Sequence, residues 1–507
     1  MAGLTSEGKT TILISCDGFR WDYNEWYDTP FLDAMASAGA KGELVPSFPS
    51  KTFPNHYTLA TGLRPEHHGI IANSFIDRKR DKRFALSDPE TKFDAYYYKG
   101  EPIWITARRQ GKRTAVFYWP GSDVAVGGQY PDLWHSYDEK PHLTFEQRID
   151  GILGQLKAKP SPDLIMAYFE EPDASGHRYG PQARQTQAAV EHIDSLLGHM
   201  WGRICKEGLR DSVNLVIMSD HGMTWYTPSR QIAITPNLQP SWYERVEGNL
   251  PANIYAPERW QQDSIVKALS HVPHLRAWRK EDIPAWLHYQ ADANIGDVVA
   301  LPDEGYLFAD GKSNKGGVHG YDPDYSDMHA LFRAYGPDIK QGVDLGQFSN
   351  TAVYAIVCRL LGIKPAPYDG TDEYQHIAPQ LFGPSRPESS GDLLMFRPLR
   401  NPYEPWETVE EMPLFPGHEG AKEYVRQFIA RHTQGKTGVQ RLTISFIVEK
   451  DGTTSGLTFS QNNHSLSEEV KTAAKQAFEQ MPRWRPGKQN GHPVRVKEQL
   501  TVNIGRQ

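Results

Sequence analysis

Four short clusters in this sequence combine carboxylate, histidine and glycine residues. They are Asp17-Gly18, Glu171-Pro-Asp-Ala-Ser-Gly-His177, Ser219-Asp-His-Gly222 and Gly317-Val-His-Gly-Tyr-Asp322. Each cluster is weak by itself, because Asp and Gly favour turns for conformational reasons and a lone histidine is more often an ordinary core or surface residue. Together they offer oxygen and nitrogen ligands without thiolates, which suits catalytic zinc. Two zinc ions in one site need about six to eight protein ligands, and the clusters supply about that many.

The segment Phe48-Pro-Ser-Lys-Thr-Phe-Pro-Asn-His-Tyr57 presents Thr52 as a candidate nucleophile. A threonine hydroxyl is a poor nucleophile until a base or a metal lowers its pKa, and a dinuclear metal site does this without a neighbouring histidine base. A structural interpretation is also open, in which Thr52 caps a helix that starts at Phe53-Pro54, since proline is common just inside a helix start. The two interpretations are compatible, because backbone N–H groups at a helix N-terminus favour phosphate.

Short apolar strands are expected to position these residues, because most of the strands are followed by an aspartate, a glycine or both. The expected strands are 11–16, 115–118, 163–169 and 213–218. Helical patterns lie between them, and one has an apolar stripe made of Ile193, Leu196, Leu197, Met200 and Ile204. This order predicts an α/β fold with a parallel sheet covered by helices. Ligands bind outside the carboxyl ends of such strands, which is where the aspartates fall.

The length of 507 residues predicts at least two domains. A formal net charge of −7 argues against a general binder of nucleic-acid polymers. Cys16, Cys205 and Cys358 lie far apart, so we expect buried free thiols and no disulfide framework. No apolar run approaches the ~18 to 20 residues of a membrane span. Because Met1–Lys9 lacks the apolar region of a signal peptide, the protein is expected to be cytoplasmic or to have lost a targeting segment.

A polar stretch rich in Pro, Gly and Ser follows Phe382 and indicates a linker. We therefore predict a first domain over 1–382, a linker over 383–408 and a second domain over 409–507. The second domain has an alternating strand from Leu442 to Val448 that ends at a hairpin turn. A helix over 467–481 and a strand over 494–504 complete the prediction of a small α+β domain.

Seven motifs, in order along residues 10 to 382, resemble the nucleotide pyrophosphatase/phosphodiesterase family of the alkaline phosphatase superfamily. They are Ser15-Cys-Asp-Gly-Phe-Arg-Trp21, Phe48–Tyr57, Thr61-Gly-Leu-Arg-Pro-Glu-His-His-Gly69, Trp119-Pro-Gly-Ser122, Glu171–His177, Ser219-Asp-His-Gly-Met223 and Gly317–Asp322. The resemblance implies an alkaline-phosphatase-like parallel sheet with helices on both faces. It also implies hydrolysis of phosphodiester or phosphoanhydride bonds of nucleotides, with release of a nucleoside 5′-monophosphate.

Carried over motif by motif, the resemblance implies two Zn²⁺ ions. The first would be held by Asp17, Thr52, Asp220 and His221, and the second by Asp173, His177 and His319. Thr52 would attack phosphorus in line, giving a phosphothreonyl intermediate that a zinc-activated water cleaves. Asn73 matches the family position that donates to a phosphate oxygen, although an ordinary loop asparagine fits the same pattern. Phe53 and Tyr137 fall where the family stacks a nucleotide base.

Vertebrate members of the family carry many disulfides and extra domains, so the three cysteines here favour a bacterial type. Two other functions stay open. The first is a diesterase for lipid-derived or glycerol and choline head groups, because the pocket walls and not the zinc motif set the substrate. The second is a largely non-catalytic interaction protein of the cell envelope, although a scaffold has no physical need for a complete set of zinc ligands around a threonine.

The second domain resembles the C-terminal domain of TonB-type energy transducers. The similar stretches are Leu414-Phe-Pro-Gly-His-Glu-Gly-Ala421, Ile444–Gly452, Met481–Arg495 and Leu500-Thr-Val-Asn-Ile504. Such domains bind partner proteins by strand addition at a sheet edge. The resemblance therefore implies a protein partner and, with the first domain, a periplasmic or otherwise extracytoplasmic location.

Overall fold

The computed structural model describes residues 8–308 and 316–383 and, in the C-terminal part, 405–406, 409, 411–416, 420–433, 440–460, 467–489 and 492–504. The chain divides into two compact units, Met1–Leu399 and Arg400–Gln507. The linker predicted over 383–408 lies mostly outside the described residues, so its boundaries stay a prediction. Within the described part, no helix combines the length and apolarity that crossing a membrane requires.

An eight-stranded sheet forms the centre of the first unit, in the order β18-β2-β17-β8-β1-β7-β5-β6. Its strands in chain order are β1 (Thr10–Cys16), β2 (Ala40–Val45), β5 (Thr114–Phe117), β6 (Leu133–His135), β7 (Leu164–Phe169), β8 (Val213–Met218), β17 (Ala330–Tyr335) and β18 (Val343–Ser349). The four strands expected from the sequence are confirmed as β1, β5, β7 and β8. They are buried along their whole length, which explains why they are continuous apolar runs.

The predicted sheet is parallel except at one strand. β17 runs antiparallel to both of its neighbours, β8 and β2, while the other pairs in the sheet are parallel. The reason is the route of the chain. β9 (Thr224–Tyr226), soon after the end of β8, pairs with β16 (Gly316–Val318), so the chain already lies at the carboxyl edge of the sheet before β17. A short connection from that edge can only enter the sheet in reverse.

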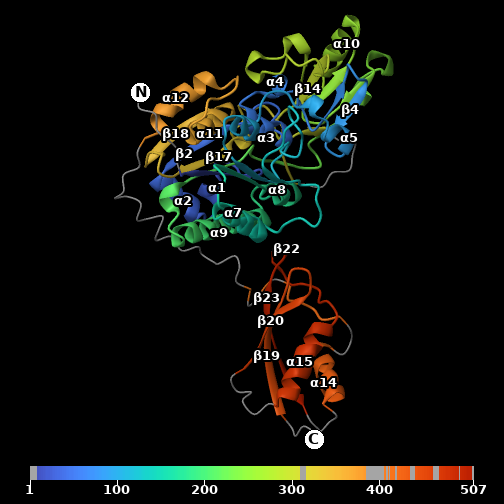
Figure 1. Ribbon diagram of the computed structural model, residues 1–507. Helices are drawn as coiled ribbons and strands as arrows, with labels where there is room; N and C mark the ends of the chain where they lie inside the picture. The colour runs from blue at the N-terminus through green and yellow to red at the C-terminus, as the bar shows by residue number, and fades with distance from the viewer. Residues whose placement is uncertain are drawn as a thin grey trace. The chain divides into compact units, whose positions relative to one another are not determined.

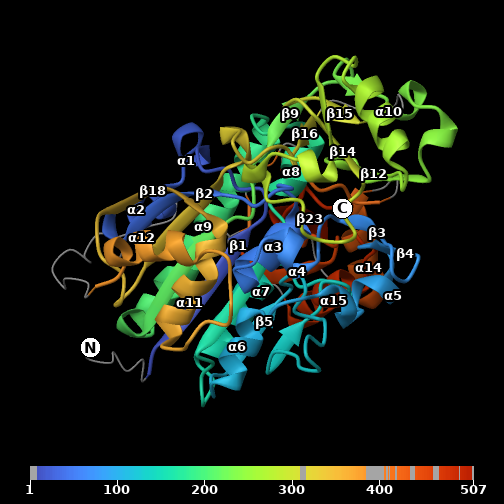
Figure 2. The ribbon, with the colours of Figure 1, turned by 90° about the horizontal axis from the view of Figure 1, so that it is seen from above.

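Helices cover both faces of the sheet (Figures 1 and 2). One layer consists of α2 (Pro30–Ala38), α7 (Phe145–Leu156) and α9 (Arg184–Lys206), and the other of α3 (Thr52–Thr61), α6 (Ile103–Arg109), α11 (Val353–Leu361) and α12 (Thr371–Leu381). The apolar stripe expected from the sequence lies on α9, and all five of its residues are buried. The predicted layered α/β architecture is therefore confirmed.

An antiparallel insertion lies between β9 and β16 in the chain. It has the strand order β11-β12-β14-β13. Its elements are β11 (Arg245–Glu247), β12 (Ala252–Tyr255), α10 (Arg259–Leu269), β13 (Leu275–Arg279) and β14 (Val298–Pro302). The hairpin of β3 (Ser74–Asp77) and β4 (Lys82–Ala85) packs beside β11. Shorter elements are α1 (Tyr23–Trp26), α4 (Pro65–His68), α5 (Pro89–Lys92), α8 (Asp173–Tyr179), β10 (Gln231–Ile232) and β15 (Leu307–Phe308).

The C-terminal unit has a three-stranded antiparallel sheet in the order β20-β19-β23. Its elements are α14 (Gly420–His432), β19 (Gln440–Val448), β20 (Thr454–Phe459), α15 (Glu468–Gln480), β21 (Lys488–Gln489), β22 (His492–Pro493) and β23 (Val496–Ile504). The two helices and the sheet share one apolar core. The predicted alternating strand, helix and last strand are thus present as β19, α15 and β23.

Candidate active site

Three neighbouring strands of the central sheet deliver the acidic site residues to one edge. Asp17 follows β1, Asp173 begins α8 after β7, and Asp220 follows β8. β1 lies between β8 and β7 with all three parallel, so their carboxyl ends meet. Gly18 lets the chain pass close to Asp173: its φ is +65°, and a Cβ there would lie 2.8 Å from Cβ of Asp173.

Thr52 is the first residue of α3, and its side chain points into this site. Its Oγ1 lies 3.1 Å from Nε2 of His221. The interpretation of Thr52 as the helix cap is wrong, because the N-cap is Lys51, whose backbone is extended, and no side chain caps this helix. The Thr52 hydroxyl is therefore not used to stabilise the helix, and it faces the residues after β8.

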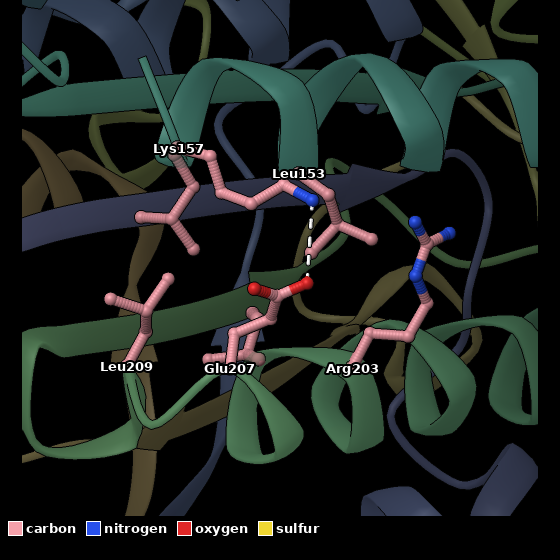
Figure 3. Close-up of a pocket in the computed structure, with 7 residues that line it drawn as sticks. Leu153, Lys157, Arg203, Glu207 and Leu209 are labelled. Atoms are coloured by element: carbon pink, nitrogen blue, oxygen red, sulfur yellow. Dashed lines mark hydrogen bonds and ion pairs between the residues drawn. The ribbon is translucent and has the colours of Figure 1, made fainter. Parts of the chain in front are cut away.

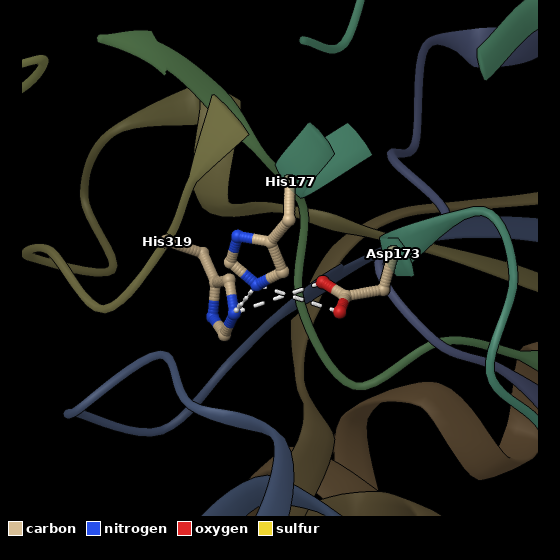
Figure 4. Close-up of side chains that lie close together, drawn as sticks. All are labelled: Asp173, His177 and His319. Carbon is tan, nitrogen blue, oxygen red and sulfur yellow. Dashed lines mark hydrogen bonds and ion pairs between the residues drawn. The ribbon is translucent and has the colours of Figure 1, made fainter. Parts of the chain in front are cut away.

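Asp173, His177 and His319 form a second group, and their side chains point toward one another (Figure 4). Nε2 of His177 lies 3.4 Å from Oδ2 of Asp173 and 3.1 Å from Nε2 of His319. The pairing of β9 with β16 places the segment before His319 against α8, which carries the other two residues. The rings of His319 and His221 stack with centroids 3.5 Å apart, so the two groups are adjacent.

The histidine rings turn their lone pairs inward. Nδ1 of His177 lies 2.9 Å from the carbonyl oxygen of Gly317, and Nδ1 of His319 lies 2.7 Å from that of Ser50. Nδ1 of His221 contacts the Gly222 carbonyl at 2.8 Å. Carbonyl oxygens only accept, so each Nδ1 donates, and in the neutral ring each Nε2 carries a lone pair that faces the site. This arrangement is the one that metal-binding histidines adopt.

The carboxylates add further acceptor atoms that lack donors. Oδ1 of Asp17, Oδ1 of Asp173 and Oδ2 of Asp220 are buried without a hydrogen-bond partner. The ligand atoms of Asp173, His177 and His319 lie within 4.8 Å of one another, as do those of Asp17, Asp173 and His221. Buried acceptors without a hydrogen-bond partner are costly, and a cation among them removes that cost. The donor set therefore fits metal ions.

Burial and close contact of the carboxylates and imidazoles also shift the pKa values of these groups. Burial raises the pKa of Asp17 well above its ordinary value, and the charges of Asp220 and Asp173 add to the effect. Burial also acts on Asp220, but His221 and His56 outweigh it and hold the pKa of Asp220 well below its usual range. Burial lowers the pKa of His319 far below its ordinary value, which keeps this ring neutral as a metal ligand requires.

Two residues that the sequence analysis did not single out support these carboxylates. Tyr168, at the end of β7, donates its hydroxyl to Oδ2 of Asp17 at 2.6 Å. His56, one turn after Thr52 on α3, lies with Nδ1 2.8 Å from the Thr52 carbonyl and 3.3 Å from Oδ2 of Asp220. The spacing of four residues from Thr52 could have identified His56, since such residues share one face of a helix.

The three residues expected to bind substrate lie in different surroundings. Asn73 precedes β3, and its Oδ1 is buried without a hydrogen-bond partner. Phe53 is only 6% exposed and packs edge-on against Tyr98. Tyr137 is half-buried, with its ring centroid 5.9 Å from that of Tyr168, which places it near Asp17. Their roles toward a substrate stay predictions.

A small surface cavity lies away from this site, between α7 and α9 (Figure 3). Its volume is about 10 Å³, and it is lined by Leu153, Leu156, Lys157, Arg203, Ile204, Glu207 and Leu209. Lys157 and Glu207 form an ion pair across it at 3.3 Å. A space of this size holds about one water molecule, so it has no part in the candidate active site.

The mixed α/β sheet and the convergence of carboxylates, imidazoles and one threonine hydroxyl at its carboxyl edge define a metal-dependent hydrolase. Residues 11–322 match the family model described as Type I phosphodiesterase / nucleotide pyrophosphatase. The chain belongs to this family, and it is an enzyme of the hydrolase class.

Several curated relatives are similar to this chain over more than 70% of its length. Ectonucleotide pyrophosphatase/phosphodiesterase family member 5 from Homo sapiens is 34% identical over 372 residues, which are 73% of this chain and 77% of that protein. The bis(5′-adenosyl)-triphosphatase ENPP4 of Bos taurus is 36% identical over 365 residues, 71% of this chain and 80% of that protein. A venom phosphodiesterase of Naja atra is 34% identical over 77% of this chain, which spans only 49% of the relative.

Solved structures support the fold. The structure of human ENPP5 matches with a TM-score of 0.69 at 33% identity, covering 74% of this chain and 100% of that chain. A structure of murine ENPP5, as an inactive variant in complex with AMP, matches with a TM-score of 0.68 at 32% identity and the same coverage. The AMP in that structure is bound to the murine protein.

Proposed function

We propose that this chain is a zinc-dependent nucleotide pyrophosphatase/phosphodiesterase. It hydrolyses phosphodiester or phosphoanhydride bonds of nucleotides and releases a nucleoside 5′-monophosphate. The observation that carries the proposal is the Thr52 hydroxyl, which is not needed as a helix cap and lies 3.1 Å from Nε2 of His221. The match to the AMP complex of murine ENPP5 supports nucleotides as the substrate class.

Two zinc ions fit the two groups of acceptor atoms. One would be held by Asp17, Thr52, Asp220 and His221, and the other by Asp173, His177 and His319. Zinc at these positions would supply positive charge that lowers the pKa of the Thr52 hydroxyl and offsets the charge of the phosphate. Imidazole and carboxylate ligands without thiolate suit zinc in catalytic sites.

Thr52 is the nucleophile of the proposed reaction. In the first step Thr52 loses its hydroxyl proton to solvent, Oγ1 forms a bond to phosphorus, and the bond from phosphorus to the leaving oxygen breaks. The product is a phosphothreonyl intermediate. In the second step a water oxygen bonds to phosphorus and the water loses one proton to solvent. The bond from phosphorus to Oγ1 breaks, Oγ1 takes up a proton, and the nucleoside monophosphate is released. Thr52 lies at the start of α3, so a phosphate bound to it would lie near the backbone N–H groups of the first helical turn.

Asn73, Phe53 and Tyr137 are proposed to hold the substrate. The Asn73 amide would donate from Nδ2 to a phosphate oxygen that does not take part in bond breaking. Phe53 and Tyr137 would contact the two faces of the base. The half-buried ring of Tyr137 next to Tyr168 supports its part in this proposal.

We also propose that the protein is of bacterial type, acts in the periplasm or another extracytoplasmic space, and binds a protein partner through a TonB-like C-terminal domain. The low cysteine count supports the first point. The antiparallel sheet of the C-terminal unit supports the last point. β23 is an outer strand of this sheet and pairs with β19 on one side, and a peptide can add to the other side of an edge strand.

The test measures zinc content and hydrolysis of thymidine 5′-(p-nitrophenyl phosphate) by the intact chain and by Thr52→Ala. We expect about two zinc ions in the intact chain and a loss of turnover of at least about 10³-fold in the variant, because the variant lacks the hydroxyl that would attack phosphorus. Thr371→Ala is the matched control, since Thr371 is also the first residue of a helix and is exposed.

A choline p-nitrophenyl phosphate assay separates the nucleotide diesterase from the head-group diesterase. Preference for the choline ester would overturn the proposed substrate class. Full activity of Thr52→Ala would show that Thr52 is not the nucleophile. Absence of bound metal after zinc loading would show that the proposed residues do not form a metal site.

A further inference from the structure

Lys51 is the residue directly before Thr52, and its side chain lies in the candidate active site. It is the N-cap residue of α3 and is half-buried. A Cβ placed on Gly320 would lie 2.5 Å from Cε of Lys51, so the aliphatic part of the lysine packs against the backbone at Gly320. Gly320 has a φ of +120° and directly follows His319. The Lys51 side chain is therefore held between the start of α3 and the loop that carries His319.

The ammonium group of Lys51 has no partner in the part of the chain that the structure describes. None of the hydrogen bonds or ion pairs there, the latter counted up to 4.0 Å, involves its Nζ. Two other buried cations have carboxylate partners: Arg20 pairs with Asp22, and Lys92 with Asp138. A cation withdrawn from water without a partner is costly, which points to a ligand that supplies the missing negative charge.

Burial and the nearby charge of Asp173 act in opposite directions on the Lys51 ammonium group. Burial lowers the pKa of Lys51 to about 8, and the charge of Asp173 works in the opposite direction. The ammonium lies beside the group of Asp173, His177 and His319, and its charge in turn contributes to the low pKa of His319.

We propose that Lys51 binds the departing phosphate of a phosphoanhydride substrate, and so makes this enzyme prefer nucleoside di- and triphosphates to nucleotide esters whose leaving group carries no phosphate. The inference rests on the proposed function. A lysine ammonium is a compact positive charge that suits phosphate oxygens. The leaving phosphate gains negative charge as its bond to the transferred phosphorus breaks, and a fixed cation next to the nucleophile stabilises that charge.

The test compares two substrates that both release thymidine 5′-monophosphate. Thymidine 5′-triphosphate leaves pyrophosphate, and thymidine 5′-(p-nitrophenyl phosphate) leaves p-nitrophenolate. We expect Lys51→Met, which keeps the length of the side chain, to lower kcat/KM for the triphosphate by about 10- to 100-fold, the usual effect of one charged hydrogen bond. The p-nitrophenyl ester should change by less than about threefold, and Lys51→Arg should restore most of the triphosphate activity.

Lys157→Met is the matched control, because Lys157 is an exposed lysine paired with Glu207 away from the site. Zinc content and thermal unfolding of each variant show whether the site is intact. An equal loss on both substrates would overturn the inference, since Lys51 would then act on the transferred phosphate or on the site itself. No loss on either substrate would overturn it as well.

A binding measurement separates failure of this inference from failure of the proposed function. Calorimetry measures binding of thymidine 5′-triphosphate to the zinc-loaded Thr52→Ala protein, with and without Lys51→Met. Weaker binding by about 10-fold or more supports the role of Lys51 even if the intact chain hydrolyses neither substrate. Equal binding contradicts that role whatever the activity of the intact chain.

Discussion

Nε2 of His177 and Nε2 of His319 lie 3.1 Å apart, although each ring gives its Nδ1 proton to a backbone carbonyl. Two neutral imidazoles in this state face one another with lone pairs, and no hydrogen bond can form between them. Protonation of one ring would relieve the contact, but burial lowers the pKa of His319 and opposes it. A metal ion between the two rings would satisfy both nitrogens at once.

The first prediction concerns metal content. His319→Ala removes one of the two facing nitrogens, so we expect the variant to bind about one zinc ion fewer than the intact chain and to lose most of its activity. Metal analysis after dialysis against a weak chelator measures the change. His271→Ala, which removes an exposed histidine outside the site, should leave the metal content unchanged. Equal zinc content in His319→Ala and the intact chain would rule out His319 as a ligand.

The second prediction concerns the residue that orients Asp17. Tyr168→Phe removes the hydroxyl that donates to Oδ2 of Asp17 at 2.6 Å and leaves this buried carboxylate without a protein donor. Loss of such an outer partner of a ligand weakens metal binding by about 10- to 100-fold, and we expect that range here. Competition with a coloured chelator measures the zinc affinity.

Tyr424→Phe is the control for this substitution. It also removes a tyrosine hydroxyl that donates to a carbonyl, in this case that of Gln480 in the C-terminal unit. Its zinc affinity should equal that of the intact chain. If Tyr168→Phe binds zinc as tightly as Tyr424→Phe, then Tyr168 does not position Asp17.

Much of the first unit could be predicted because its signals are local. β1, β7 and β8 are continuous apolar runs, and each leads to an aspartate within a few residues. Contacts between distant elements gave no such signal. Tyr168 reaches Asp17 only because β7 pairs with β1, and the reversal of β17 depends on the path of the chain before it. The cap of α3 was misplaced by one residue, since the extended backbone of Lys51 cannot be inferred from residue types.

The third prediction concerns stability and pH at Asp194. This carboxylate on α9 accepts hydrogen bonds from the backbone N–H groups of Phe31 and Leu32, at 3.2 and 2.8 Å, and so caps α2 from another helix. Burial raises the pKa of Asp194 to about 7, although these hydrogen bonds act against the shift. The unfolded chain has a value near ~3.9, so the folded state binds the proton more tightly. Its stability therefore falls as the pH rises from about 4 to about 7.

Asp194→Asn removes this titration. We expect the free energy of unfolding of the variant, relative to the intact chain, to rise with pH by up to about 1.4 kcal/mol per pH unit between those values. Urea unfolding at pH 5, 6, 7 and 8 measures the difference. Asp372→Asn is the control, because Asp372 is an exposed carboxylate in the first turn of α12. A difference that stays constant with pH would show that Asp194 does not titrate in this range.

The last prediction concerns the C-terminal unit, whose core is separate from that of the first unit. Trp484 is only 7% exposed, and its ring lies 5.3 Å from that of Phe415 and 5.6 Å from that of Phe446. Removing a buried tryptophan side chain costs about 3 to 5 kcal/mol, a large part of the stability of a small unit. We therefore expect Trp484→Ala to unfold the C-terminal unit and to leave the first unit folded.

Hydrogen exchange followed by mass spectrometry distinguishes the two units. In Trp484→Ala, peptides from β19 should lose protection while peptides from β8 keep it, and hydrolysis of thymidine 5′-(p-nitrophenyl phosphate) should stay within about twofold. Trp286→Ala is the control, because Trp286 is 59% exposed and its loss removes little packing. Loss of protection in β8 as well would show that the two units unfold as one, because the core around Trp484 would then contribute to the stability of the sheet that carries Asp17 and Asp220.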